Sequence, residues 1–158
     1  MPPVPATATP DYDGAKATSR RQEHRVSEIS FVSKTVLVTG GASGIGRGVA
    51  LAFGRAGAQV VVSDIAVAGG EDTAAQIIAA GGQAIFVRAD VAVAADVEAL
   101  VAKTVATYGR LDCAFNNAGI EEENQRLADS DDAVFDRMMA INVKGVWLCM
   151  KHQIRQML

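Results

Sequence analysis

Residues 35–46 read TVLVTGGASGIG, and this stretch decides the fold. It begins with a short apolar run, typical of a buried strand, and continues into the glycine-rich turn Thr39–Gly46. Beyond the turn, apolar residues recur at helical spacing until Gly57, which can adopt the left-handed conformation that ends a helix. The predicted apolar face of this helix consists of Ile45, Val49, Phe53 and Ala56. A strand, a loop and a helix are therefore expected in direct succession.

Strand and helix patterns alternate along the rest of the chain. Further strands are predicted at residues 59–63, 84–88 and 111–115, and helices at residues 72–80, 94–108 and 130–158. The apolar face of the helix over residues 94–108 comprises Val97, Leu100, Val101, Val105 and Tyr108. Parallel strands need a long connection to return to the same edge. The alternation therefore predicts an α/β fold, a Rossmann-like doubly wound parallel sheet with helices on both faces.

No strand pattern follows the last predicted helix. We therefore expect the sheet to be truncated after its fourth strand and the following long helix. Residues 111–115 would form a buried strand whose outer edge is open. Unpaired backbone groups and exposed apolar surface at such an edge predict poor solubility of the isolated chain.

Composition bounds the domain organisation and the possible partners. The 158 residues suffice for one domain over residues 31–158, incomplete at its C-terminus, after a disordered tail over residues 1–30. A formal net charge of -3, spread along the chain, argues against nucleic acid as a partner. No apolar run approaches the ~20 residues that span a bilayer, and the N-terminus has no signal-peptide pattern, so we expect a cytoplasmic protein without a membrane partner. Cys113 and Cys149 have no metal-ligand spacing, so they are expected to be reduced, buried thiols, and no metal site is predicted.

The glycine turn and the acid that follows it suggest a dinucleotide site. Thr39–Gly46 lies where a strand passes into a helix, a place where glycines let the backbone approach a pyrophosphate, although glycines alone would also fit a tight turn. Asp64 ends the next strand, where a carboxylate accepts hydrogen bonds from ribose hydroxyls and repels a 2′-phosphate. A plain loop-initiating acid would leave this spacing unexplained. Neither Ser43 nor Ile65 supplies a cation for that phosphate, so the sequence favours NAD(H) over NADP(H).

Four motifs in one order resemble the short-chain dehydrogenase/reductase family. Thr39–Gly46 fits the TGxxxGIG loop of that family, and Asp90–Val91 resembles its acid and apolar pair at the adenine ring. Asn116–Gly119 reads NNAG, the signature after the fourth strand, and Asn142 matches the helix asparagine of the catalytic tetrad. The resemblance runs from about Lys34 to the end of the chain.

This resemblance implies a nicotinamide cofactor lying across the carboxyl ends of the strands. The expected pyrophosphate contacts are Gly40, Ser43, Gly44, Ile45 and Gly46. The adenosine half is expected at Asp64, Ile65, Asp90 and Val91, and the nicotinamide side at Asn117, Ala118 and Gly119. In the family the NNAG segment also supports the sheet. Taken singly, Asn116 or Asn117 would fit a turn with local side-chain hydrogen bonds.

The family transfers a hydride between nicotinamide and an alcohol or ketone. Its tyrosine acid/base has a pKa lowered by the lysine of a YxxxK motif, and a serine and an asparagine complete the tetrad. Of these, Asn142 is present. Tyr12 and Lys16 spell YxxxK, but they precede the glycine turn, and we reject them as a catalytic pair. Tyr108 is expected to be a core aromatic. The chain is therefore expected to carry the cofactor-binding half and to be inactive alone, with a structural role for Asn142.

Three functional interpretations stay open. The first is an NAD(H)-dependent oxidoreductase whose complete form acts on an alcohol or ketone and is a homo-oligomer through the last helix, with Trp147 in the contact. The second is a non-catalytic NAD-binding module. The third is a partner subunit that pairs with a complete relative through the same helix. The family's substrate pocket is built largely after Asn142, so no substrate is predicted, and Glu121–Glu123 fits either a pocket rim or a solvated loop.

Overall fold

The computed structural model describes residues 29–121 and 126–158. Almost all of the predicted disordered tail over residues 1–30 lies outside these described residues, as do Tyr12 and Lys16. Four parallel strands form one sheet in the order β3-β2-β1-β4. The strands are β1 (Thr35–Thr39), β2 (Gln59–Asp64), β3 (Gln83–Arg88) and β4 (Cys113–Asn116). The expected α/β, Rossmann-like parallel sheet is confirmed.

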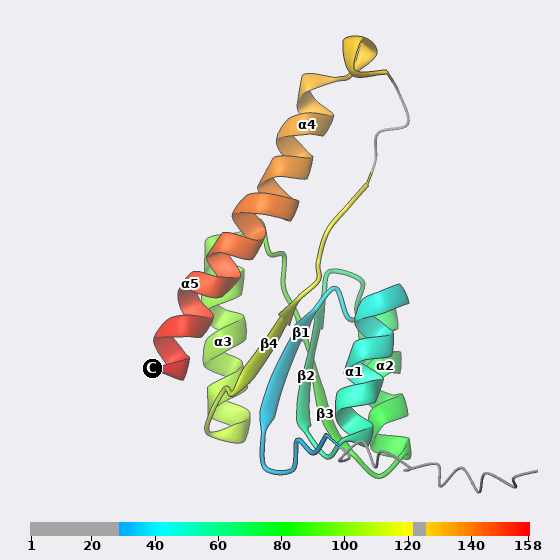
Figure 1. Ribbon diagram of the computed structural model, residues 1–158, viewed down its shortest axis with the longest axis vertical. Coiled ribbons are helices and arrows are strands. Elements are labelled where there is room, and N and C mark those ends of the chain that lie inside the picture. The colour runs from blue at the N-terminus through cyan, green and yellow to red at the C-terminus, as the bar shows by residue number, and fades with distance from the viewer. Residues whose placement is uncertain (1–28, 122–125) are drawn as a thin grey trace, which may run out of the picture.

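Helices cover both faces of this sheet. α1 (Gly44–Arg55) and α2 (Val67–Ala79) lie on one face, and α3 (Ala94–Tyr108) lies on the other with the C-terminal helix (Figure 1). The core under α1 and α2 includes Val36, Val38, Val60, Val62, Ala50, Ala74 and Ile77. The core under α3 includes Leu37, Val61, Leu100, Val101 and Leu111. Cover on both faces explains why β1 and β2 are continuous apolar runs rather than alternating ones.

The buried face of α1 differs from the prediction. Ile45 is 74% exposed, whereas Gly46, Ala50 and Gly54 are the buried residues of this helix. A Cβ atom added to Gly54 would lie 2.7 Å from the Ile77 side chain. The helix therefore packs so closely that small residues form its inner ridge, and the larger apolar residues flank it.

Several predicted boundaries also change. α2 begins at Val67 instead of Asp72, and its first turn packs closely on the sheet: a Cβ added to Gly70 would overlap the Phe86 ring of β3. The fourth strand is Cys113–Asn116 rather than 111–115, and it is half-buried rather than buried. Among the described strands it pairs with β1 alone, so it is an edge strand and one side of it lacks a neighbour. The expected burial is therefore wrong for Cys113 and correct for Cys149.

The predicted helix over residues 130–158 is continuous but not uniform. A short 3₁₀ turn, η1 (Leu127–Asp129), precedes α4 (Asp132–Met138), a π-helical segment η2 (Met139–Gly145) and α5 (Val146–Met157). The Asp131 side chain accepts a 2.9 Å hydrogen bond from the Ala133 N–H and caps the helix, as its acidic start suggested. α4 extends beyond the sheet, whereas α5 lies along α3 (Figure 1).

One side of this last helix carries large exposed apolar side chains. They recur at spacings of three and four residues, which places them on one helix face. They are Phe135, Met139, Val143, Trp147, Met150 and Ile154. In residues 29–121 and 126–158, no helix is long and apolar enough to cross a membrane.

Candidate functional site

A cavity of about 550 Å³ opens at the carboxyl ends of the strands, where the loops after β1, β2, β3 and β4 meet. Its size falls in the ~300–1,000 Å³ range of small-molecule sites. The predicted cofactor-binding residues that line it are Gly40, Ser43, Gly44, Ile45, Asp64, Ile65, Asp90, Val91, Asn117, Ala118 and Gly119. Lining residues that sequence reasoning missed are Thr39, Ser63, Ala89, Ile120 and Ile141. The cavity thus gathers segments that are far apart in the chain, from Thr39 to Ile141.

The glycine loop between β1 and α1 needs its glycines for two different reasons. Gly44 has a φ of +51° and open space around its added Cβ, so the backbone conformation requires glycine. A Cβ on Gly40 would lie 2.8 Å from the Asn117 amide nitrogen, and a Cβ on Gly46 would overlap the Gly40 carbonyl oxygen. Gly46 therefore packs behind the loop and does not line the cavity. It lets α1 begin directly beneath Gly40.

The N-terminus of α1 faces the cavity through Ser43, Gly44 and Ile45. Ser43 is the N-cap in an extended conformation, and within this described helix no side chain caps the first turn and no acidic residue lies in it. The first backbone N–H groups of a helix have no partner inside the helix, and the helix dipole makes this end favourable for an anion.

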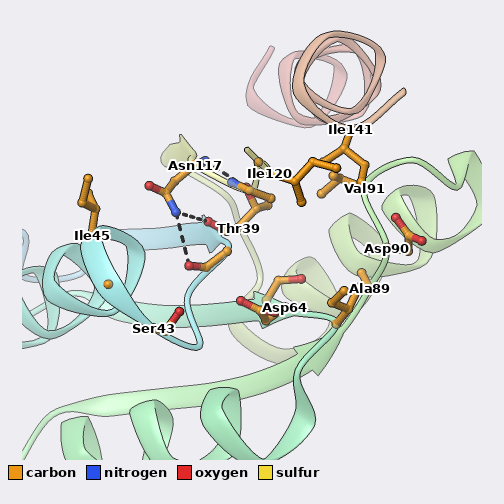
Figure 2. A pocket seen from close by; sticks show the side chains of 16 residues that line it. Thr39, Ser43, Ile45, Asp64, Ala89, Asp90, Val91, Asn117, Ile120 and Ile141 are labelled. Atoms are coloured by element: carbon orange, nitrogen blue, oxygen red, sulfur yellow. Dashed lines mark hydrogen bonds between the residues drawn. The ribbon is translucent and has the colours of Figure 1, made fainter. Parts of the chain in front are cut away.

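Asp64 is half-buried at the end of β2 and is held by two backbone amides. Its Oδ2 accepts a 2.9 Å hydrogen bond from the Ala42 N–H, and its Oδ1 accepts one of 2.9 Å from the Ala66 N–H. These bonds tie the carboxylate to the glycine loop and to the segment after β2, and in Figure 2 it lies between Ser43 and Ala89. Each oxygen keeps a lone pair for a further donor from the cavity.

Asp90 lies across the cavity from the glycine loop, after β3 (Figure 2). Its Oδ1 accepts a 2.9 Å hydrogen bond from the Ala92 N–H, and its own N–H donates to Asp96 Oδ2 over 3.0 Å. Asp96, in the first turn of α3, therefore holds the Asp90 backbone. Next to it, Val91 lines the cavity and packs on α5 through Leu148.

The NNAG segment joins β4 to the glycine loop. The Asn117 side-chain amide donates to the carbonyls of Thr39 and Gly40 over 3.3 and 3.2 Å (Figure 2). In return, Thr39 Oγ1 accepts hydrogen bonds from the N–H groups of Asn117 and Ala118, at 3.1 and 3.2 Å. Asn117 thus makes long-range contacts instead of a local turn.

Asn116 pairs with α5 rather than with its own turn. Its side-chain amide and that of Gln153 exchange two hydrogen bonds of 2.8 Å. Gln153 is only 3% exposed. A buried glutamine needs a polar partner, but the sequence alone showed neither the burial of Gln153 nor the residue that pairs with it.

Asn142 lies in the π-helical segment and does not line the cavity. Its Oδ1 accepts from the Ile120 N–H over 2.9 Å and its Nδ2 donates to the Ile120 carbonyl over 2.8 Å. A Cβ on Gly119 would lie 3.1 Å from the same Oδ1. The side chain therefore anchors the end of the NNAG segment, while the neighbouring Ile141 reaches the cavity.

Two ionisable side chains outside the cavity, Cys149 and Tyr108, have pKa values that are raised by burial. Burial raises the pKa of the Cys149 thiol to about 11, which keeps it protonated and unreactive at neutral pH. Burial also raises the pKa of Tyr108, which packs on the core under α3.

Among the described residues, no group of three or more His, Cys, Asp or Glu could hold a metal ion. Glu121 is exposed, and the rest of the acidic segment lies outside the described residues.

Comparison with known proteins adds family membership to this geometry. Residues 34–158 match the family model described as short chain dehydrogenase. The chain belongs to the short-chain dehydrogenase family. Family members bind a nicotinamide cofactor and small-molecule substrates, in agreement with the expected family resemblance.

Relatives within this family include dehydrogenases of different names. The chain is 47% identical over 125 residues to the 2,5-dichloro-2,5-cyclohexadiene-1,4-diol dehydrogenase of Sphingobium indicum, covering 79% of the chain and 49% of the relative. It is 40% identical to the secoisolariciresinol dehydrogenase of Forsythia intermedia, covering 79% and 45%. The chain thus spans about half the length of the curated relatives that it matches.

Solved structures of short-chain dehydrogenases share the fold. A hydroxysteroid dehydrogenase from Escherichia coli matches with a TM-score of 0.78 and 30% identity, over 82% of this chain and 55% of that one. A short-chain dehydrogenase/reductase from Mycobacterium marinum matches with a TM-score of 0.78 and 34% identity, over 81% and 51%.

Proposed function

We propose that this chain binds NAD(H) in the cavity and belongs to an oxidoreductase that transfers a hydride between nicotinamide and an alcohol or ketone. Because the chain spans about half of its relatives, cofactor binding is proposed for the described part and hydride transfer for the whole protein. The observation that carries the proposal is the Asp64 carboxylate, fixed by two amides at the cavity wall beside a glycine loop.

The cavity residues fit a dinucleotide. The uncapped start of α1 and the backbone of Gly40, Ser43 and Gly44 would hold the pyrophosphate. Asp64 would accept the adenosine ribose hydroxyls, and the adenine would lie near Ile65, Asp90 and Val91. Asn117, Ala118 and Gly119 would face the nicotinamide side. Among the described side chains, the buried Ser63 hydroxyl has no hydrogen-bond partner, and its residue borders the cavity.

The preference for NAD(H) over NADP(H) rests on charge. Asp64 would lie where a 2′-phosphate would have to go, and like charges repel. Arg47, the cation closest in sequence to the glycine loop, is bound to Ala42, Gly69, Asp72 and Thr73, so it is not available to a phosphate without breaking those contacts.

A bound nicotinamide would supply the hydride chemistry, and this chain's own residues would position it. Asn117 holds the end of β4 against the loop, and the apolar side chains of Val91, Ile120 and Ile141 would limit water in the cavity. Asn142 supports Ile120 from behind and would act as a positioning residue.

A second candidate function follows from the exposed apolar residues of the last helix. Such a face is typical of a subunit contact, so we infer that the protein is a homo-oligomer, or a partner of a longer relative, through this helix.

We assign the cofactor-binding domain to residues 31–158. The two free cysteines fit the reducing cytoplasm.

Calorimetric titration of the 158-residue chain with NADH and NADPH tests the cofactor proposal. NADH should bind more tightly, and Asp64→Asn should remove most of that preference. Asp136→Asn makes the same charge change on α4, away from the cavity, and should leave the preference intact. Absence of saturable NADH binding, or equal affinities in the native chain, would rule the proposal out.

A further inference from the structure

Two side chains of opposite charge hold the same two backbone segments beside the cavity. Asp64 accepts hydrogen bonds from the N–H groups of Ala42, in the glycine loop, and Ala66, at the start of α2. Arg47 donates to the carbonyls of Ala42 and Gly69, at 2.6 and 3.1 Å. Asp64 thus binds backbone amides of the glycine loop and of the start of α2, and Arg47 binds backbone carbonyls of the same two segments.

Arg47 is itself fixed at this position. Its Nε donates to the Thr73 hydroxyl over 3.0 Å, and that hydroxyl donates to the Gly69 carbonyl over 2.9 Å. Its Nη1 lies 3.1 Å from Asp72 Oδ2. Thr73 is fully buried, so its hydroxyl has a set direction. The planar guanidinium, with five donors, can serve all of these acceptors at once.

The two segments touch where Arg47 holds them. A Cβ on Gly69 would lie 2.9 Å from the Ala42 carbonyl oxygen, so the first turn of α2 packs directly on the loop. Without the guanidinium, the Ala42 carbonyl would lose its side-chain donor, the Gly69 carbonyl would keep only the Thr73 hydroxyl as one, and no donor would join the two carbonyls. Their repulsion, and water entering to solvate them, would separate the loop from α2. The amides of Ala42 and Ala66 would then no longer hold Asp64 in one place.

We propose that Arg47 is a positioning residue for cofactor choice: by joining the Ala42 and Gly69 carbonyls, it sets the two amides that aim the Asp64 carboxylate. This inference rests on the proposed binding of NAD(H). It assigns to Arg47 a role that is opposite to that of a simple cation. A cation near the site would favour NADPH, which carries an extra phosphate. Arg47, by fixing the position of Asp64, instead strengthens discrimination against NADPH.

Arg47→Met in the full chain separates these roles. If Arg47 positions Asp64, this substitution should lower the ratio of NADH to NADPH affinity about tenfold, which corresponds to the free energy of about one hydrogen bond to a charged group. Loss of a simple cation would instead raise the ratio. Two controls should stay within about twofold of the native ratio. Asp72→Asn removes the ion pair and keeps the carbonyl contacts, and Arg55→Met removes an exposed cation from the last turn of α1.

Amide hydrogen exchange on the nucleotide-free chain provides a second measurement. The N–H groups of Ala42 and Ala66 should exchange faster in Arg47→Met and at the native rate in Asp72→Asn. An unchanged or raised affinity ratio in Arg47→Met, or unchanged exchange at both amides, would overturn this inference alone. If the native chain binds neither dinucleotide, the proposed function is overturned and the inference with it.

Discussion

Three glycines of α1 have different reasons to be glycine, so alanine substitutions should give three different results. At Gly48, which is helical and exposed with open space around its added Cβ, Gly48→Ala should stabilise the chain by about 0.5–1 kcal/mol. At Gly44, the space is open but φ is +51°, so Gly44→Ala should cost about 1–2 kcal/mol. At Gly46, a Cβ would overlap the Gly40 carbonyl oxygen and lie 2.7 Å from the Asn117 amide nitrogen. The Gly40 carbonyl and the Asn117 amide are joined by a hydrogen bond that holds the glycine loop, so Gly46→Ala should cost about 3 kcal/mol or more of folding free energy.

Urea denaturation measures the free energy of unfolding across this series, and NADH titration measures the site. Gly46→Ala should lose NADH binding because the loop must move, and Gly44→Ala should weaken it because the methyl group would stand in the cavity. Gly48→Ala, outside the cavity, should bind as the native chain does. If Gly46→Ala were as stable as Gly48→Ala and bound NADH normally, the close packing of α1 beneath Gly40 would be refuted.

Asp64→Ala should destabilise the chain by about 1–3 kcal/mol in denaturant titrations, because the buried Ala42 N–H loses its acceptor while the exposed Ala66 N–H finds water; an unchanged midpoint would contradict this. For Asp112, burial alone would raise the pKa, but hydrogen bonds from the Thr35 N–H, Arg110 and Lys34 outweigh it and the pKa is lowered. The stability that ionised Asp112 gives to the folded chain should therefore be present above the ordinary carboxyl pKa of about 3.9. It should be lost as pH falls through the lower pKa that Asp112 has in the folded chain. The stability difference between the native chain and Asp112→Asn should shrink on acidification, and a constant difference from neutral to acid pH would count against it. Cys149, with a pKa of about 11, should resist alkylation at about pH 8 until the chain unfolds, as followed by mass spectrometry; native labelling as fast as that of a free thiol would disagree.

Features that depend on residues close together in the chain were predictable. The helix over residues 94–108 has the predicted bounds, because its apolar spacing and the stop at Gly109 are local signals. Asp64 was found as a site candidate because a strand end and a charged residue coincide in the sequence. The glycine loop and the NNAG segment were recognised by their spacing, and both line one cavity.

The amino-acid sequence by itself determined which segments are strands and helices, and which polar residues end the strands, because apolar periodicity and glycine conformation act over a few residues. Only the tertiary structure decided the half-buried edge position of β4, the small-residue ridge of α1, the start of α2 at Val67, and the contacts of Arg47 and Asn116. These depend on how closely two segments approach and on which buried donor meets which acceptor. Such partners lie tens of residues apart, and packing and the need to satisfy buried polar groups select them once the sheet has formed.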